Sequence, residues 1–454
     1  MATVIESDIN REKELKLFRE QIEKRTGKTP EQLYEEREKR VMDTLQLREP
    51  DRVPVLTDDL CYFSLRQAGL PASTVYYDPE LTWKVFVQAT LDFEPDLWRG
   101  PRTYAIHSGI ALEALDDKQI RWPGGTLPPD VTTQYIERDD MKEDEYDLFI
   151  TDPTDFMIRR YLARIYGALE CLPKIPPLGL RLLKSGFVDL TTTLSRTEFR
   201  KLARVLFKAG KEETKWRQVF DVVEEDLGSL GFPPFLYNFG DVANFGGIGD
   251  PPVDYIAVRL RGLRGMVTDM FRQPEKVILA CERILEWQLA RATPADPTQK
   301  WNPRRVGVGT AHYGSDDFMS KKQFETFYWP TWKKLITATI DLGYFPSVFF
   351  EGIADERLEY MLELPKGKFS VGFERVNMAR AKAILGNHCG IIGGVPIAML
   401  QTASPQEVEE HCKELIKACG KGGGFMLSCC SNLSDAKPAN IRAMVDSVVK
   451  YGKY

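Results

Sequence analysis

The chain has 454 residues, with 61 basic and 66 acidic side chains and a net charge of −5. This length suggests two or three average domains or one large α/β domain with insertions, and it allows a large buried core. The near balance of charge argues against binding to nucleic acid. The 11% of aromatic residues argues against general disorder.

No segment predicts secretion or a membrane span. The N-terminus lacks the apolar stretch of a secretory signal, and no run approaches the roughly 18 apolar residues that cross a membrane. Eight cysteines without a Cys-x-x-Cys pair are typical of a reduced protein and not of a disulfide scaffold. We therefore expect a cytoplasmic protein that binds neither membrane nor nucleic acid.

The first 50 residues predict a helical N-terminal extension. Residues 1–50 are highly charged and place apolar side chains at helical spacing. They carry no obvious chemistry, so we expect them to cap the rest of the chain or to contact a second subunit in a homodimer.

Eight short apolar segments predict buried parallel strands. The last five alternate with helical patterns, which requires right-handed crossovers and a parallel sheet. The eight segments are 53–57, 96–100, 235–240, 305–312, 345–352, 368–375, 389–396 and 423–430. Eight βα units predict an α/β fold of the (β/α)8 type, a TIM barrel of about 250 residues.

The barrel is expected to span 51–454, with a long insertion at about 101–230. A doubly wound open sheet is the alternative, although no G-x-G-x-x-G fingerprint follows any predicted strand. Two local signals place helices between strands. Pro330 is expected to restart or kink a helix, and Ser404, Pro405 and Glu407 form the start of another.

Polar residues at the predicted strand ends are the candidates for a site, because barrel enzymes build their sites there. These residues are Asp58, Asp59, Trp98, Arg99, Asp241, His312, Glu351, Glu374, Arg375, Cys429 and Cys430. For substrate binding we select Asp58, Tyr62, Phe63, Trp98, Asp241 and Arg375, with the three aromatic residues as pocket walls. We interpret the loop 240–252, which contains four glycines, as a flexible active-site loop.

His312 and Glu351 are the predicted catalytic pair. His312, one of only four histidines, follows a buried strand, where it could carry a proton or hold a metal. Glu351 follows three apolar residues and needs a cation, a metal or a hydrogen-bond donor as its partner. The alternatives are a hydrogen-bonded strand-end histidine and an internal ion pair.

Cys430 is the third predicted metal ligand. Cys429 and Cys430 point to opposite sides in a strand, so at most one faces the mouth of the barrel. A thiolate beside His312 and Glu351 would complete a set of N, S and O donors that zinc accepts. The alternative is that both cysteines are small buried residues. His388 precedes a strand and His411 lies within a helix, so neither is expected in the site.

Several segments resemble the uroporphyrinogen decarboxylase superfamily. The resembling segments are 40–56, 260–277, 318–336, 385–396 and 436–452. The resemblance covers most of 235–454 and implies a TIM barrel. The true decarboxylases grip porphyrinogen carboxylates with a segment M-R-Q-A-G-R-Y. This chain has LRQAGLP at 65–71, which lacks the second arginine and the tyrosine.

The resemblance is closer to the corrinoid-dependent methyltransferase branch, which holds zinc through His-x-Cys and a distant cysteine. Here the His-x-Cys-Gly position reads Phe349-Phe350-Glu351-Gly352, and the late cysteine falls at or beside Cys430. The implied zinc ligands are therefore Glu351, Cys430 and His312. Such a set suits the oxygen of a methoxy or hydroxyl compound better than a thiol.

The leading hypothesis is an enzyme that moves a methyl group between a small substrate and a corrinoid carried on a partner protein, in anaerobic one-carbon metabolism. Glu351 would act as ligand or general acid and His312 as ligand or proton shuttle. The first alternative is a decarboxylase of a porphyrinogen or other small carboxylate, with Arg66, Arg99 and Arg375 as an anion clamp. The second is a non-catalytic protein that binds a corrinoid or tetrapyrrole.

Overall fold

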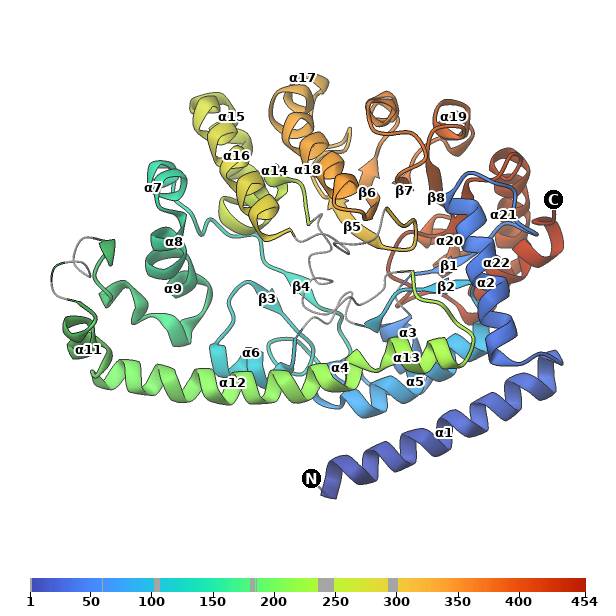
Figure 1. Cartoon of the computed structure of the whole chain (residues 1–454), viewed down its shortest axis with the longest axis horizontal. Coiled ribbons are helices and arrows are strands. Elements are labelled where there is room, and N and C mark those ends of the chain that lie inside the picture. Colours follow the sequence, from blue (N-terminus) through green and yellow to red (C-terminus); the bar gives the residue numbers. More distant parts are fainter. Residues whose placement is uncertain are drawn as a thin grey trace.

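A five-stranded parallel sheet forms the centre of the C-terminal half (Figure 1). The structure is a computed structural model that describes residues 2–58, 60–101, 107–179, 184, 186–235, 249–292 and 301–454. The strands lie in chain order as β5 (Val306–Ala311), β6 (Phe345–Ile353), β7 (Ser370–Arg375), β8 (Gly390–Gly394) and β9 (Phe425–Ser428). The prediction of five successive parallel strands is confirmed.

Helices connect these strands and cover one face of the sheet. They are α17 (Lys321–Gln323), the π-helix η7 (Phe324–Tyr328), α18 (Trp329–Asp341), the 3-10 helix η8 (Leu358–Glu363), α19 (Met378–Leu385), α20 (Ile397–Thr402), α21 (Pro405–Cys419) and α22 (Pro438–Tyr451). Both predicted helix starts are confirmed. Pro330 lies in the first turn of α18, directly after the π-helical turn, and Ser404 forms a capping box with Glu407.

The first two predicted strands are shorter than expected. They consist of β1 (Leu56–Thr57) and β2 (Leu97–Trp98), which pair in parallel. Val55 forms a parallel bridge with Leu427 of β9, and Trp98 forms one with Pro234. The first strand therefore lies beside the last, with β2 and the segment at Pro234 next in order. The predicted strand 235–240 lies outside the described residues beyond Phe235.

The N-terminal region is helical, as predicted. It consists of α1 (Ala2–Thr26), at one edge of the molecule in Figure 1, and α2 (Pro30–Leu45). Phe18 and Ile22 of α1 pack against the main core. Three helices follow: the short α3 (Cys61–Gln67) and α4 (Thr74–Tyr77), and the longer α5 (Pro79–Phe93). None of the described helices is both long and apolar enough to cross a membrane.

The predicted insertion is mostly helical and lies to one side of the sheet (Figure 1). It begins with α6 (Gly109–Leu115) and the antiparallel pair β3 (Ile120–Arg121) and β4 (Gln134–Tyr135). Short helices follow: α7 (Tyr146–Thr151), α8 (Pro153–Phe156), η2 (Met157–Tyr161), α9 (Leu162–Ile165), η3 (Gly167–Leu169), η4 (Leu172–Lys174) and α11 (Val188–Leu194). The 25-residue α12 (Thr197–Asp221) and α13 (Val223–Ser229) lead back toward the sheet. Before β5 come α14 (Pro252–Asp254), η6 (Tyr255–Leu260), α15 (Gly262–Arg272) and α16 (Pro274–Arg291).

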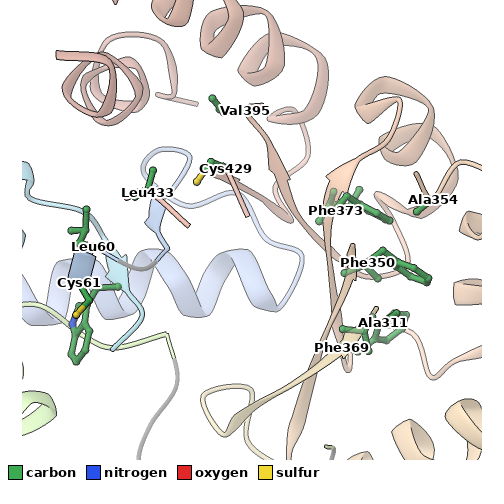
Figure 2. Packing of buried hydrophobic residues seen from close by; sticks show 14 of the residues in the cluster. Leu60, Cys61, Ala311, Phe350, Ala354, Phe369, Phe373, Val395, Cys429 and Leu433 are labelled. Atoms are coloured by element: carbon green, nitrogen blue, oxygen red, sulfur yellow. The ribbon is translucent and has the colours of Figure 1, made fainter. Parts of the chain in front are cut away.

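The two faces of the sheet pack differently, because successive side chains in a strand point to opposite sides. Figure 2 shows Ala311, Phe350 and Phe373 of the helix-covered face, and the last two rings stack 6.1 Å apart. We call the opposite side the inner face. Its cluster contains Leu56, Leu97, Phe235, Val306, Phe345, Ile392, Met426 and Cys430, with Val41 and Leu45 of α2.

A buried ionic cluster joins α2 to the first two strands. The fully buried carboxylate of Asp96 accepts hydrogen bonds from Arg40 Nη1 (2.6 Å), Arg52 Nη1 (2.6 Å) and the backbone N–H of Val55 (2.9 Å). Burial alone would raise the pKa of Asp96, but the two guanidinium charges and these hydrogen bonds hold it below its usual value. The cluster fixes the segment that leads into β1.

Replacing Asp96 by Asn is expected to lower the free energy of unfolding by about 3–5 kcal/mol, because two largely buried guanidinium groups would lose its charge and Arg40 would keep only its more exposed partner Asp51. The measurement is chemical denaturation. Glu94→Gln is the control, since it removes only the more exposed ion pair with Arg25 (2.9 Å) and should change stability by about 0.5 kcal/mol or less. Equal effects of the two substitutions would contradict the role of the cluster.

Candidate active site

His312 and Glu351 lie side by side at the carboxyl ends of β5 and β6. The register pairs Ala311 of β5 with Phe350 of β6. The residues that follow them, His312 and Glu351, are therefore neighbours as well. Alternation from Val306 and Phe345 places both polar residues on the inner face. His312 Nδ1 lies 2.8 Å from Glu351 Oε2, within hydrogen-bond distance. The structure thus brings together the predicted pair, in side chains that are 29% and 45% exposed.

A fully buried carboxyl group lies behind His312. Asp254, at the end of α14, accepts hydrogen bonds from the backbone N–H groups of His312 (2.8 Å) and Tyr313 (3.3 Å) and from the hydroxyl of Tyr328 (2.6 Å). Burial raises the pKa of Asp254 to about 7, although its hydrogen bonds and the charge of His312 act in the opposite direction. Burial and the neighbouring Asp254 also raise the pKa of Tyr328 well above its usual value.

Asp254 could not be predicted as a site residue, because it does not lie at a strand end. It follows the glycine-rich loop and sits in a three-residue helix that starts at Pro252. The only signal in the sequence is that helix start, in which an acidic residue comes two positions after a pair of prolines. Nothing in the sequence links this segment to the end of β5.

Carboxyl groups surround the imidazole of His312 on several sides. Asp250 Oδ2 lies 4.0 Å from Nε2, while Glu351 binds Nδ1. Burial alone would lower the pKa of His312, but the hydrogen bond and charge of Glu351, together with the charges of Asp254 and Asp250, raise it to about 9. His312 is therefore a cation at neutral pH, and its Nδ1–H donates to Glu351.

The described residues do not fit the predicted zinc site. Cys430 belongs to a separate polar group with Ser428 and Asp58, whereas His312 and Glu351 bind each other. Within the described ranges, no three His, Cys, Asp or Glu side chains are grouped so that they could hold a metal ion. The chemistry proposed below therefore uses no zinc.

Cys430 belongs to a second polar group, at the ends of β1, β2 and β9. Ser428 Oγ donates to Asp58 Oδ2 (2.7 Å), and Arg99 Nη1 lies 3.1 Å from Asp58 Oδ1. The backbone N–H of Cys430 donates to Ser428 Oγ (3.2 Å). Cys430 lies in the inner cluster, whereas Cys429 packs in the main core, near Leu433 in Figure 2. The two cysteines thus point to opposite sides, as the sequence predicts.

The aromatic residues predicted as pocket walls occupy other positions. Trp98 packs in the main core, where its Nε1–H donates to the carbonyl of Phe232 (2.9 Å). Phe63 packs edge-on against Phe93 in the same core, with ring centroids 5.4 Å apart. We therefore correct the assignment of Phe63 and Trp98, because alternation turns Trp98 away from the inner face and both rings are buried among helices. Tyr62 donates to or accepts from Thr133 (2.8 Å) and lines a cavity of about 300 Å³ together with Arg66.

Glu374 and Arg375 of β7 stabilise the loops around the site. Glu374 Oε2 accepts from the backbone N–H of Gly352 (2.7 Å), the residue after Glu351. Gly352 has φ +85°, a conformation that favours glycine, and it lies where the pairing of β6 with β7 becomes irregular, between Phe350 and Ile353. The exposed Arg375 donates to Asp317 (2.7 Å), so substrate binding by Arg375 stays a prediction.

The remaining predicted residues lie outside the described part of the chain, and the other three histidines lie away from His312. Asp59, Asp241 and most of the loop 240–252 fall outside the described residues. His388 lies before β8 and donates from Nε2 to the carbonyl of Leu364 (2.9 Å). His411 donates from Nε2 to the carbonyl of Gly394 (2.9 Å), and His107 pairs with Glu213 (3.0 Å) in the insertion.

The fold and this strand-end pair place the protein among α/β proteins with a parallel sheet, and comparison with known proteins narrows the class. Residues 307–451 match the family model "Uroporphyrinogen decarboxylase (URO-D)". The matched residues contain four complete strands of the sheet and most of β5, with both His312 and Glu351. The resemblance predicted from the sequence is thereby confirmed.

A solved structure with a similar fold is a methyltransferase from Methanosarcina mazei. The TM-score is 0.54 at 14% sequence identity, and the alignment covers 91% of this chain and 98% of that chain. At this identity the likeness concerns the fold. Because it covers 91% of the chain, most of the insertion at 101–230 has a counterpart in that protein. No curated protein matches the chain.

Replacing Glu351 by Gln is expected to lower the pKa of His312 from about 9 toward its usual value of 6.5, because the hydrogen bond to a charged acceptor is lost. The measurement is an NMR titration of the four histidine rings, with His312 assigned by its absence in His312→Asn. Glu213→Gln, beside His107, is the control and should leave the titration of His312 unchanged.

The same pair is expected to make stability depend on pH. The folded-state pKa of His312 lies above its unfolded value, so the stabilisation is complete below about pH 6.5 and is lost as the pH rises through about 9. The difference in unfolding free energy between wild type and Glu351→Gln should therefore shrink between pH 6 and pH 10. A constant difference would contradict the pairing.

Proposed function

We propose that the protein is a methyltransferase that moves a methyl group between a small methoxylated substrate and a corrinoid carried on a partner protein. The observation that carries the proposal is the hydrogen-bonded pair of His312 and Glu351 on the inner face of neighbouring strands. The match to the URO-D family and the methyltransferase of similar fold support an enzyme of the methyltransferase or decarboxylase type.

In this proposal His312 is the general acid. Its Nδ1–H is committed to Glu351, while Asp250 lies too far from Nε2 for a direct hydrogen bond, so Nε2–H is the proton available to a substrate. As the methyl group leaves, Nε2 protonates the oxygen that carried it, which avoids a free oxyanion. Glu351 orients the ring and stabilises its charge before the transfer. The corrinoid would supply the acceptor for the methyl group.

We also propose that the strands close into a (β/α)8 barrel. In a doubly wound sheet the strand order reverses, whereas here β5 to β9 follow chain order and β1 lies beside β9. Arg304, just before β5, donates to the carbonyl of Pro234 (2.8 Å), which brings the segment at Pro234, next in order after β2, close to β5. Closure would bring the polar groups of the inner face together at one mouth.

The proposed setting is the cytoplasm, where the eight cysteines, all free and buried, would stay reduced. A homodimer through the N-terminal helices belongs to the same proposal, and Leu17 of α1, which is 56% exposed, is the first residue to test by analytical ultracentrifugation.

The family match supports decarboxylation of a porphyrinogen or another small carboxylate as a second candidate. His312 would then protonate the carbon that loses carbon dioxide. An anion clamp would need arginines that are not neutralised, yet Arg66 pairs with Asp435, Arg99 with Asp58 and Arg375 with Asp317. These pairs lower the attraction for a substrate carboxylate and favour methyl transfer.

His312→Ala and Glu351→Gln are each expected to lower kcat for methyl transfer, the first by about 10²–10⁴-fold, because the leaving oxygen loses its proton donor. The assay follows methylation of cob(I)alamin by a panel of methoxylated compounds without oxygen. His107→Gln, in the insertion, should keep full activity. If the wild type releases carbon dioxide from a porphyrinogen but transfers no methyl group, and His312→Ala loses this release, the protein is instead a decarboxylase.

A further inference from the structure

The backbone that carries His312 is held from two sides by buried charged groups. On one side, Asp254 accepts hydrogen bonds from His312 and Tyr313. On the other, Arg357, which is 1% exposed, donates from Nε to the carbonyl of Gly314 (2.9 Å) and from Nη2 to the carbonyl of Ser315 (3.4 Å). Buried charges are costly, so this arrangement points to a need for a fixed position more than to stability.

Asp254 satisfies a backbone group that the sheet cannot reach. β5 ends at Ala311, so the N–H of His312 is the first that follows the strand. Asp254 Oδ2 accepts from this N–H and from Tyr328, and Oδ1 accepts from the N–H of Tyr313. Since both oxygens are already occupied by protein donors and the residue is 1% exposed, Asp254 does not contact substrate directly.

Tyr328 reaches Asp254 because residue 314 has no side chain. A Cβ atom at Gly314 would lie 2.6 Å from Tyr328 Cζ, closer than atoms can approach. The aromatic ring therefore packs directly on the loop that follows His312, with its hydroxyl directed at Asp254. Loop, tyrosine and carboxylate form one connected unit.

We propose that Asp254 and Tyr328 are positioning residues, which fix the backbone of His312 so that Nδ1 meets Glu351 and Nε2 faces the substrate. The proposal rests on the proposed function, in which Nε2 delivers the proton. A small displacement of the ring would break the hydrogen bond to Glu351 and misdirect the proton, although neither Asp254 nor Tyr328 takes part in the transfer.

A second buried pair of a tyrosine and an aspartate provides a matched control. Tyr146 of α7 donates to Asp269 of α15 (3.0 Å), and both residues are fully buried, as Tyr328 and Asp254 are. Asp269 binds Arg261 (2.6 Å) instead of the backbone of the site. Loss of the tyrosine hydroxyl therefore removes the same kind of buried hydrogen bond in both places, but only one of them supports His312.

The experiment compares Tyr328→Phe and Asp254→Asn with Tyr146→Phe and Asp269→Asn in the full-length protein. Tyr328→Phe is expected to lower kcat for methyl transfer about 10-fold or more, with KM within about twofold, whereas Tyr146→Phe keeps kcat. Both are expected to lower the thermal midpoint by similar amounts. If kcat falls equally in Tyr328→Phe and Tyr146→Phe, the proposal is overturned.

A second readout does not depend on turnover. The Nδ1–H proton of His312, hydrogen-bonded to Glu351, should give a downfield NMR signal that is absent in Glu351→Gln. This signal is expected to shift or broaden in Tyr328→Phe and in Asp254→Asn, and to stay unchanged in Tyr146→Phe and Asp269→Asn. An unchanged signal in Tyr328→Phe overturns the positioning role. If Asp254→Asn does not fold, the result for Tyr328→Phe alone tests the proposal. Absence of methyl transfer in wild type, with the signal shifts as expected, would refute only the proposed function.

Discussion

The alternation of side chains along parallel strands decides what this protein presents at the carboxyl edge of its sheet. Val348, Phe350 and Phe373 face the helices, while Glu351 and His312 lie on the opposite, inner face. A shift of one residue in β6 would exchange Glu351 for Phe350 and leave His312 without its partner. The buried helix-facing side chains hold the register, and the register in turn holds His312 beside Glu351.

The buried ionic groups act at the points where this regular pattern ends. Asp96 binds the backbone of Val55 at the entry to β1, and Asp254 binds the backbone of His312 at the exit from β5. In both places a carboxylate accepts from N–H groups that no strand neighbour satisfies. The two sites differ in charge compensation, since two arginines contact Asp96, whereas Asp254 has tyrosine and backbone donors.

Patterns local in sequence predicted much of this structure, and contacts distant in sequence account for what they missed. The runs around Val348 and Val371 are almost continuously apolar, so their burial in a parallel sheet follows from the sequence, as does the position of Glu351 near a strand end. Trp98 was misassigned because the sequence of so short a strand does not show which of its two residues, Leu97 or Trp98, faces inward. Asp254 was missed because its role exists only through backbone groups nearly 60 positions away.

Under the proposed function, the acidity of His312 limits which leaving groups it can protonate. An imidazolium with a pKa of about 9 is a weaker acid than free histidine, because Glu351, Asp254 and Asp250 all favour its charged form. Proton donation is most effective when the acid and the leaving group have similar affinities for the proton. A phenol, with a pKa near 10, is close in acidity to this imidazolium, so its oxygen gains from protonation as it leaves. A carboxylic acid has a pKa near 4, so a carboxylate leaves without protonation. If His312 is the general acid that we propose, its electrostatics favour aryl methyl ethers over methyl esters as substrates.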